Sequence, residues 1–282
     1  MKIVKTIAEV REEVKEWRRQ GLTVGLVPTM GFLHEGHKSL IERAVSENDR
    51  VVVSDFVNPT QFGEGEDLEA YPRDIHRDAA LCREVGANLI FHPEVSEMYA
   101  EGACTMVDMK GEMTTGLCGK TRPIHFRGVC TVVSKLFNIV TPDRAYFGQK
   151  DAQQLAVIKR MVKDLNFDIE IVGCPIVREA DGLAKSSRNT YLSEEERKAA
   201  LVLSQAVRKG QEMMESGETN LDRITDAMKG LISAEPLARI DYVEAVNAEN
   251  IQPVHSTEDC EQVLVAMAVY IGKTRLIDNF IS

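Results

Sequence analysis

The sequence has 282 residues, and its 34 basic and 44 acidic side chains give a formal net charge of −10 at pH 7. This charge argues against long-range attraction to nucleic acid or to an anionic membrane surface, although a local cationic pocket is compatible with it. Hydrophobic residues make up 44% of the chain and charged residues 28%, so we expect it to fold along its whole length. The length allows one large domain or two of unequal size.

The longest apolar run, residues 263–271, is about half of the roughly 18–20 residues that a membrane helix needs. Residues 1–13 are charged and lack the apolar core of a secretion signal, so we expect a cytoplasmic protein without membrane partners. The six cysteines form no CxxC pair. This pattern favours reduced thiols over a zinc site or a redox dithiol.

Short β-branched runs alternate with helical patterns through the first part of the chain, as in successive βαβ units. The strands are expected at residues 22–27, 51–57, 88–91, 144–147 and 168–172, and the helices at 37–48, 74–85, 128–140 and 151–165. The second strand is almost entirely apolar, as a parallel strand covered on both faces should be. We therefore predict a Rossmann-like, doubly wound parallel sheet in an α/β fold.

The pattern changes near residue 175. A long helix is predicted to begin after Ser193, which is followed by three glutamates, and a second helix near residues 221–232. Two alternating strands follow, at 239–246 and 262–271. We predict a catalytic domain at residues 1–175 and a smaller α+β domain at 176–282, which would act as a lid.

Ligands of open parallel sheets bind beyond the carboxyl ends of the strands, so the loops there are the candidate site. His34 and His37 follow the first strand at the start of a helix, where both rings and the helix N-terminus favour a phosphate. Alone, such a histidine pair can equally cap or pack. Neither a P-loop nor a dinucleotide-binding glycine pattern is present.

Three other loops are rich in polar groups, and each also allows a structural interpretation. Asn58 and Gln61 suit a hydroxyl or carboxylate, although Asn-Pro is a common turn. Lys150 suits a transferring phosphoryl group, and Asp151 suits either a ribose hydroxyl or a helix N-cap. Cations and hydroxyls at residues 185–189 form a candidate polyphosphate clamp. Arg122 adds a cation before the helix at 128–140, although its loop could equally be a solvated one that ends in a helix-capping glycine.

Five strings give the chain a resemblance to the pantoate–β-alanine ligase family, within the HIGH-motif nucleotidylyltransferase superfamily. They are PTMGFLHEGHKSLI at 28–41, FVNPTQF at 56–62, YPRD at 71–74, RPIHFRGVCTVVSKLFNIVTPDRAYFGQKDAQQ at 122–154 and SSRN at 186–189. The resemblance implies ATP-dependent condensation of pantoate with β-alanine through pantoyl adenylate, giving pantothenate, AMP and pyrophosphate. It also implies Mg²⁺ bound mainly through the ATP phosphates, with no protein metal site, and a homodimer.

The resemblance also implies roles for individual residues. The catalytic set would be His34, His37, Lys150, Ser186, Ser187 and Arg188. ATP would in addition meet Met30, Gly148, Asp151, Val177 and Lys185, with Arg122 as a further phosphate contact. Pantoate would bind Gln61, Gln154 and Met30. Closure of the lid would deliver the SSRN loop and exclude water from the adenylate.

The chain departs from the family pattern at two positions. Lys185 stands where methionine is frequent, and its cation would either contact a phosphate of ATP directly or point to solvent, of which we favour solvent. Ala152 stands where an aromatic residue is frequent. Three other functions compete with ligation. A nucleotidylyl transferase fits the histidine loop equally well but fits the two glutamines and the SSRN loop less well. A tRNA-charging enzyme would need a longer and less acidic chain. A noncatalytic nucleotide sensor would be expected to have lost at least one of His34, His37, Lys150 and Arg188, and all four are present.

Overall fold

The computed structural model describes residues 1–282 and divides the chain into two compact units. The first unit holds residues 1–109, 122–148 and 157–175, and the second holds 110–121, 149–156 and 176–282. One of the boundaries between the two units falls after residue 175. Segments 110–121 and 149–156, which we expected in the first domain, instead belong to the second unit.

Apolar packing explains why these two segments belong to the second unit. Leu117, Ala152 and Ala156 are buried in one cluster with residues of the C-terminal region, among them Leu264 and Ala266. A sequence-based division assigns continuous stretches to each domain and has no means of detecting such an exchange. Lys150 and Asp151 therefore lie in the second unit.

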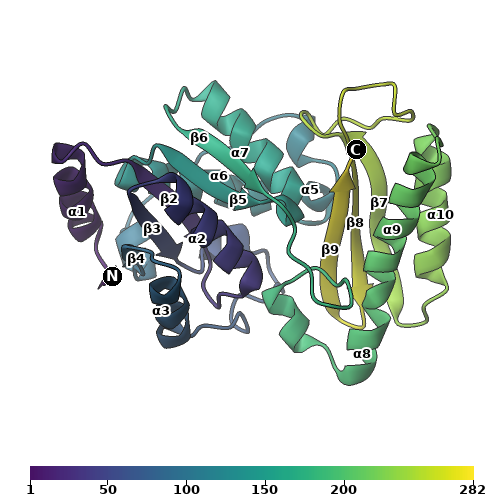
Figure 1. The fold of residues 1–282 in the computed structure, drawn as a ribbon, viewed down its shortest axis with the longest axis horizontal. Coiled ribbons are helices and arrows are strands. Elements are labelled where there is room, and N and C mark those ends of the chain that lie inside the picture. Colours follow the sequence, from purple (N-terminus) through teal and green to yellow (C-terminus); the bar gives the residue numbers. More distant parts are fainter. The chain divides into compact units, whose positions relative to one another are not determined.

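A six-stranded parallel sheet forms the centre of the first unit, in the order β1-β4-β3-β2-β5-β6 (Figure 1). The strands are β1 (Lys2–Val4), β2 (Val24–Thr29), β3 (Arg50–Asp55), β4 (Leu89–Phe91), β5 (Arg144–Gly148) and β6 (Glu170–Cys174). The five predicted strands are confirmed within about two residues. The edge strand β1 was not predicted, because its three residues are too few to show a periodic pattern.

Helices accompany this sheet. They are α1 (Ile7–Arg19), α2 (Glu35–Glu47), α3 (Ile75–Glu84), α4 (Val95–Met98), α6 (His125–Val140) and α7 (Ala152–Asp164), with the 3-10 turn η1 (Pro59–Gln61) after β3. Helix α7 begins in the second unit and ends in the first. The core between α2, α3 and the sheet includes Val27, Leu33, Ile41, Val53 and Ile90, all at most 1% exposed. Buried Leu33 fixes the loop that precedes His34.

The second unit is built on an antiparallel sheet, β7 (Ala238–Asn247), β8 (Val263–Ile271) and β9 (Thr274–Ile281). Helices α9 (Leu201–Glu215) and α10 (Leu221–Ser233) pack on it (Figure 1). The single helix predicted after Ser193 is divided into two, because one residue separates the end of α8 (Glu194–Ala199) from the start of α9. The remaining short elements are η2 (Glu112–Thr114), α5 (Cys118–Thr121), η3 (Gln149–Asp151) and η4 (Ser187–Tyr191). No helix in the chain has the length and apolar character needed to span a membrane.

Candidate active site

The histidine loop connects β2 to α2 in the first unit, and His34 is the N-cap of the helix. Its Nδ1 accepts a hydrogen bond from the Gly36 amide at 3.1 Å, while the His34 amide donates to Nδ1 of His37 at 3.3 Å. The two rings lie with their centroids 4.1 Å apart. The local sequence thus forms a capping box in which histidines take the places usually held by Ser and Glu.

These bonds determine which ring nitrogen carries the proton. A neutral imidazole has one acceptor and one donor nitrogen, and in both rings Nδ1 is the acceptor. Nε2 of His34 and of His37 therefore carries hydrogen. Two N–H donors side by side at a helix N-terminus suit an anion, because the helix dipole adds to their partial positive charge.

A buried amide, that of Gln61, lies in η1 and is held at both ends. Asn58 Nδ2 donates to its Oε1 at 3.0 Å, and its own Nε2 contacts Met30 Sδ at 3.2 Å. Asn58 is itself fixed, since its Oδ1 accepts from the hydroxyl groups of Tyr99 at 2.8 Å and Thr60 at 3.0 Å. The sequence predicted Gln61 and Met30 at one site, and the structure brings them into contact.

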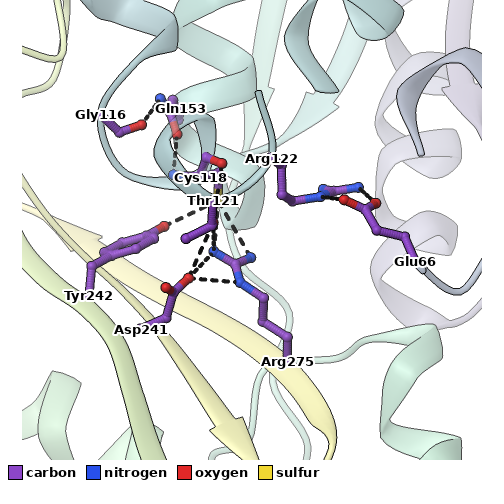
Figure 2. A network of polar contacts seen from close by, with 9 residues as sticks. All are labelled: Glu66, Gly116, Cys118, Thr121, Arg122, Gln153, Asp241, Tyr242 and Arg275. Atoms are coloured by element: carbon purple, nitrogen blue, oxygen red, sulfur yellow. Dashed lines mark hydrogen bonds and ion pairs between the residues drawn. The ribbon is translucent and has the colours of Figure 1, made fainter. Parts of the chain in front are cut away.

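Helix α6 packs against the same turn, η1. Gly128 packs so closely on the main chain of Thr60 and Gln61 that a side chain there would overlap it. Arg122 donates to the Gln61 carbonyl at 3.3 Å and forms a two-point ion pair with Glu66, at 3.0 and 2.6 Å (Figure 2). Arg122, predicted as a phosphate contact, is thus already paired with a carboxylate. In this structure it fixes the Gln61 turn.

The second unit contains Lys150 and Asp151, in the η3 turn after β5. Lys150 Nζ lies 3.8 Å from Asp151 Oδ2. Asn279 of β9 holds the main chain of the turn, since its Nδ2 donates to the carbonyl oxygens of Gln149 at 3.1 Å and Lys150 at 2.8 Å. The C-terminal strand therefore sets the position of the lysine.

The preceding residue of β9, Asp278, supports the loop that leads to SSRN. Asp278, 1% exposed, accepts two hydrogen bonds from Arg178, at 2.7 and 2.9 Å. Arg178 lies in the turn of residues 177–185, which the Lys185 amide closes by donating to the Val177 carbonyl at 2.9 Å. Ser186 then caps η4, accepting from the Arg188 amide at 3.3 Å. These bonds give the SSRN loop a defined main-chain shape.

Segment 110–121 is held by a separate polar network of the second unit (Figure 2). Buried Gln153 accepts from the Cys118 amide at 2.9 Å and donates to the Gly116 carbonyl at 2.9 Å. Arg275 donates to Asp241 at 2.8 Å and lies 3.6 Å from Cys118 Sγ. The segment is thus held by hydrogen bonds from Gln153 of α7 and by polar contacts with residues of the C-terminal sheet.

The predicted site residues fall into two groups. Met30, His34, His37, Gln61, Arg122 and Gly148 lie in the first unit, and Lys150, Asp151, Gln154, Val177, Lys185, Ser186, Ser187 and Arg188 in the second. Sequence reasoning missed the supporting residues Asp278 and Asn279, and also Asp78, whose two oxygens accept from the Phe32 and Leu33 amides ahead of His34. Asn58 was noticed, but only as a candidate ligand, because a supporting role is defined by a partner far away in the sequence.

A parallel sheet with paired imidazole donors after its first long strand is an arrangement found in enzymes that bind nucleotide phosphates. Comparison with known proteins narrows this class. The model of the family described as pantoate-beta-alanine ligase matches residues 2–281. The chain belongs to the pantoate–β-alanine ligase family.

Individual relatives agree with this assignment. The pantothenate synthetase of Clostridium acetobutylicum is 61% identical over 280 residues, covering 99% of each chain, and that of Enterococcus faecalis is 61% identical over 280 residues, covering 99% of this chain and 98% of the relative. The solved pantothenate synthetase of Thermus thermophilus is 46% identical with a TM-score of 0.92, covering 99% of each chain. The enzyme of Francisella tularensis, solved with a β-γ ATP ligand and β-alanine, is 35% identical with a TM-score of 0.81, covering 99% of this chain and 97% of that one.

Proposed function

We propose that the chain joins pantoate to β-alanine in two half-reactions. In the first, a pantoate carboxylate oxygen attacks the α-phosphorus of ATP, the bond to the β-phosphate oxygen breaks, and pyrophosphate leaves. In the second, the β-alanine amine attacks the acyl carbon of pantoyl adenylate, loses a proton and expels AMP. Adenylation is chemically necessary, because a free carboxylate has no good leaving group.

The arrangement of His34 and His37 is the observation that supports this proposal most strongly. Both present an Nε2–H donor, since both Nδ1 atoms accept main-chain hydrogen bonds. Negative charge grows on the α-phosphate oxygens during attack, and fixed donors stabilise that charge without reorganising. We assign the two rings to those oxygens.

The other roles follow the same chemistry. Lys150, Ser186, Ser187 and Arg188 would hold the phosphates, with Lys150 fixed through its main chain by Asn279. Gly148 and Asp151 would adjoin the ribose. A Cβ atom at Gly148 would have no neighbour within 4 Å, so there is open space beside this residue. Val177 would contact the nucleotide, and Lys185 is proposed to face solvent.

Pantoate is assigned to Gln61, Gln154 and Met30. The Gln61 amide is 7% exposed and preset by Asn58, so it would bind pantoate with little loss of side-chain entropy. Pantoate hydroxyl and carboxylate groups match an amide that both donates and accepts.

Magnesium is proposed to enter with ATP. No group of three or more His, Cys, Asp or Glu side chains is arranged to hold a metal ion, so we assign it no protein ligands. Mg²⁺ usually keeps several waters and binds substrate phosphates, where it would neutralise their charge.

The second unit is proposed to act as a lid that excludes water from the adenylate. Small-angle scattering with and without a non-hydrolysable ATP analogue tests this directly. A smaller radius of gyration with the analogue supports closure, whereas identical profiles contradict it. We further propose a cytoplasmic homodimer, which sedimentation equilibrium of the purified protein would distinguish from a monomer.

The reaction itself is tested by incubating the enzyme with ATP, Mg²⁺ and pantoate, and following pyrophosphate and AMP separately. Pyrophosphate should form with pantoate alone, and AMP with pantothenate should appear only after β-alanine is added. A folded, ATP-binding protein that releases no pantoate-dependent pyrophosphate would contradict the proposed function.

A further inference from the structure

A tyrosine hydroxyl from another part of the first unit reaches the turn that carries Gln61. Tyr99 ends the short helix α4, where its amide donates to the Val95 carbonyl at 2.8 Å. Its hydroxyl donates to Oδ1 of Asn58 at 2.8 Å, across 41 residues of sequence. The ring packs against Phe56, with the two ring centroids 6.4 Å apart. The substrate contacts proposed above make no use of this tyrosine.

The orientation of the Asn58 amide is fixed by a main-chain carbonyl. The Gly128 carbonyl oxygen lies 3.2 Å from one end of the Asn58 side chain. A carbonyl oxygen can only accept, so that end must be the nitrogen Nδ2. The oxygen Oδ1 therefore faces the hydroxyl groups of Tyr99 and Thr60, which donate to it at 2.8 and 3.0 Å. Asn58 is 1% exposed, so a reversed amide would bury two oxygens against each other.

The orientation of Asn58 in turn fixes that of Gln61. Asn58 Nδ2 also donates to the Gln61 side chain at 3.0 Å, and only the oxygen Oε1 can accept that hydrogen bond. Nε2 of Gln61 then lies at the other end of the amide, 3.2 Å from Met30 Sδ. A thioether sulfur is a weak acceptor, so this nitrogen keeps most of its donor capacity for an oxygen of the substrate.

Two hydroxyl groups hold the far end of this network. Burial raises the pKa of Tyr99 and the hydrogen bond with Thr60 lowers it, with burial the larger effect, so the phenol keeps the proton that it donates. Thr60 Oγ1 lies 3.2 Å from Tyr99 Oη as well as 3.0 Å from Asn58 Oδ1. Without the phenol, Thr60 alone would hold the Asn58 oxygen.

We propose that Tyr99 is a positioning residue for pantoate, which acts through Asn58 to hold the Gln61 amide with its N–H end toward the substrate. The proposal rests on the assignment of Gln61 to pantoate under the proposed function. When the hydroxyl is absent, Asn58 loses one of its two hydroxyl donors, and the Gln61 amide is ordered only when pantoate binds. Ordering a side chain on binding lowers affinity, so the effect should be confined to pantoate.

Two conservative variants separate positioning from stability. Tyr99→Phe removes the hydroxyl and keeps the packed ring. Tyr146→Phe is the matched control, because it removes a buried hydroxyl of the same unit that contacts Glu47 at 2.8 Å and Asn48 at 2.7 Å instead of the Gln61 turn. Unfolding temperatures show whether both variants are folded and how much stability each has lost.

The experiment measures kcat and the KM values for pantoate, ATP and β-alanine in both variants and the unchanged enzyme. Tyr99→Phe should raise the KM for pantoate about fivefold, the usual worth of one hydrogen bond, and leave kcat and the other two KM values unchanged. Tyr146→Phe should change none of them. An unchanged KM for pantoate in folded Tyr99→Phe, or an equal rise in the control, would overturn the proposal.

A double variant tests whether Tyr99 acts through Asn58. If it does, Tyr99→Phe should cause no further rise in the KM for pantoate once Asn58→Ala is present, because the intermediate link is already gone. A fivefold rise on top of the effect of Asn58→Ala would show that Tyr99 acts by another route and would contradict the proposal.

Another readout does not depend on activity. The side-chain NH₂ group of Gln61 should give the heteronuclear NOE of an ordered group in the unchanged protein and a lower value in Tyr99→Phe. If the enzyme makes no pantoate-dependent pyrophosphate but these values differ as expected, the proposed function fails while the connection from Tyr99 to Gln61 stands. Equal values in the two proteins would rule that connection out.

Discussion

The side chain of Asn279 holds the main chain of Lys150, since its Nδ2 donates to the Lys150 carbonyl at 2.8 Å and to the Gln149 carbonyl at 3.1 Å. Its own Oδ1 is buried without a hydrogen-bond partner, so the residue is placed for donation alone. The C-terminal strand therefore determines where a cation expected to bind phosphate lies.

Replacing Asn279 should weaken ATP binding. Asn279→Ala removes both hydrogen bonds to the η3 turn, and we expect the KM for ATP to rise about tenfold because the lysine is no longer preset. Asn279→Asp should be worse than alanine, because a carboxylate cannot donate and repels the two carbonyl oxygens. Asn250→Ala, in the turn after β7, is the control and should leave the KM unchanged. Equal KM values in Asn279→Ala and the control would contradict the assignment.

The Arg178–Asp278 pair should dominate the stability of the second unit. Arg178→Met leaves the Asp278 carboxylate, which is 1% exposed, without its partner, and removing one partner of a buried pair costs about 3 kcal/mol or more. Urea denaturation measures this loss. Arg178→Lys should lose less, since it keeps the charge and one bond, and Asp278→Asn in the Arg178→Met background should recover part of the stability. A change below about 0.5 kcal/mol in Arg178→Met would show that the pair is not needed.

Glu66→Gln distinguishes two roles for Arg122. If Arg122 fixes the Gln61 turn, as its bond to the Gln61 carbonyl indicates, loosening the ion pair should raise the KM for pantoate a few-fold and leave that for ATP unchanged. A lower KM for ATP in Glu66→Gln would instead indicate that the released guanidinium binds phosphate.

The same variant should change the response to acid. Burial raises the pKa of Glu66, but the hydrogen bonds and charge of Arg122 outweigh it, so the pKa lies below its ordinary value. A lowered carboxyl pKa gives stability that is present above the unfolded value of about 4.3 and is lost as the pH falls through the folded value. Thermal unfolding between pH 6 and 3 should therefore show a smaller decline for Glu66→Gln than for the unchanged protein. Parallel curves would count against the contribution of this pair.

Gln61→Ala should weaken pantoate binding and largely spare β-alanine. The expected loss is about 1–3 kcal/mol, the cost of leaving a bound polar group without its partner. Asn58→Ala should weaken pantoate binding by a smaller amount, because it removes the hydrogen bond of 3.0 Å from Asn58 Nδ2 that orients the Gln61 side-chain oxygen. Steady-state KM values for both substrates decide this, and equal effects on pantoate and β-alanine would refute the assignment of Gln61.

Apolar periodicity and family resemblance predicted the parallel sheet, its order of helices and strands, and the loops that carry the candidate residues. Strand β9 was missed, because Arg275, Asp278 and Asn279 interrupt its apolar pattern, and α1 was missed among the many charges of residues 9–19. The two segments that belong to the second unit could not be predicted, because their placement depends on side-chain packing across more than 100 residues of sequence. Supporting pairs such as Arg178 with Asp278 cannot be predicted for the same reason, since 100 residues separate the two partners in the sequence.

In the proposed mechanism, His34 acts through its Nε2–H on the transition state while its Nδ1 caps α2. Asparagine and glutamine at this position separate the two tasks. His34→Asn keeps a good N-cap, because its Oδ1 can accept from the Gly36 amide in place of Nδ1, but its side chain is too short to place a donor at the position of Nε2. His34→Gln is a poorer cap, but its longer side chain carries an amide donor near the position of Nε2.

The measurement is the single-turnover rate of pantoate-dependent pyrophosphate release in both variants, together with the Kd for ATP and the unfolding temperature. We predict that His34→Asn folds and binds ATP almost normally but releases pyrophosphate about a hundredfold more slowly, and that His34→Gln recovers part of the rate despite lower stability. A His34→Asn variant that loses ATP affinity but keeps the single-turnover rate at saturating ATP would contradict the assignment of His34 to the transition state.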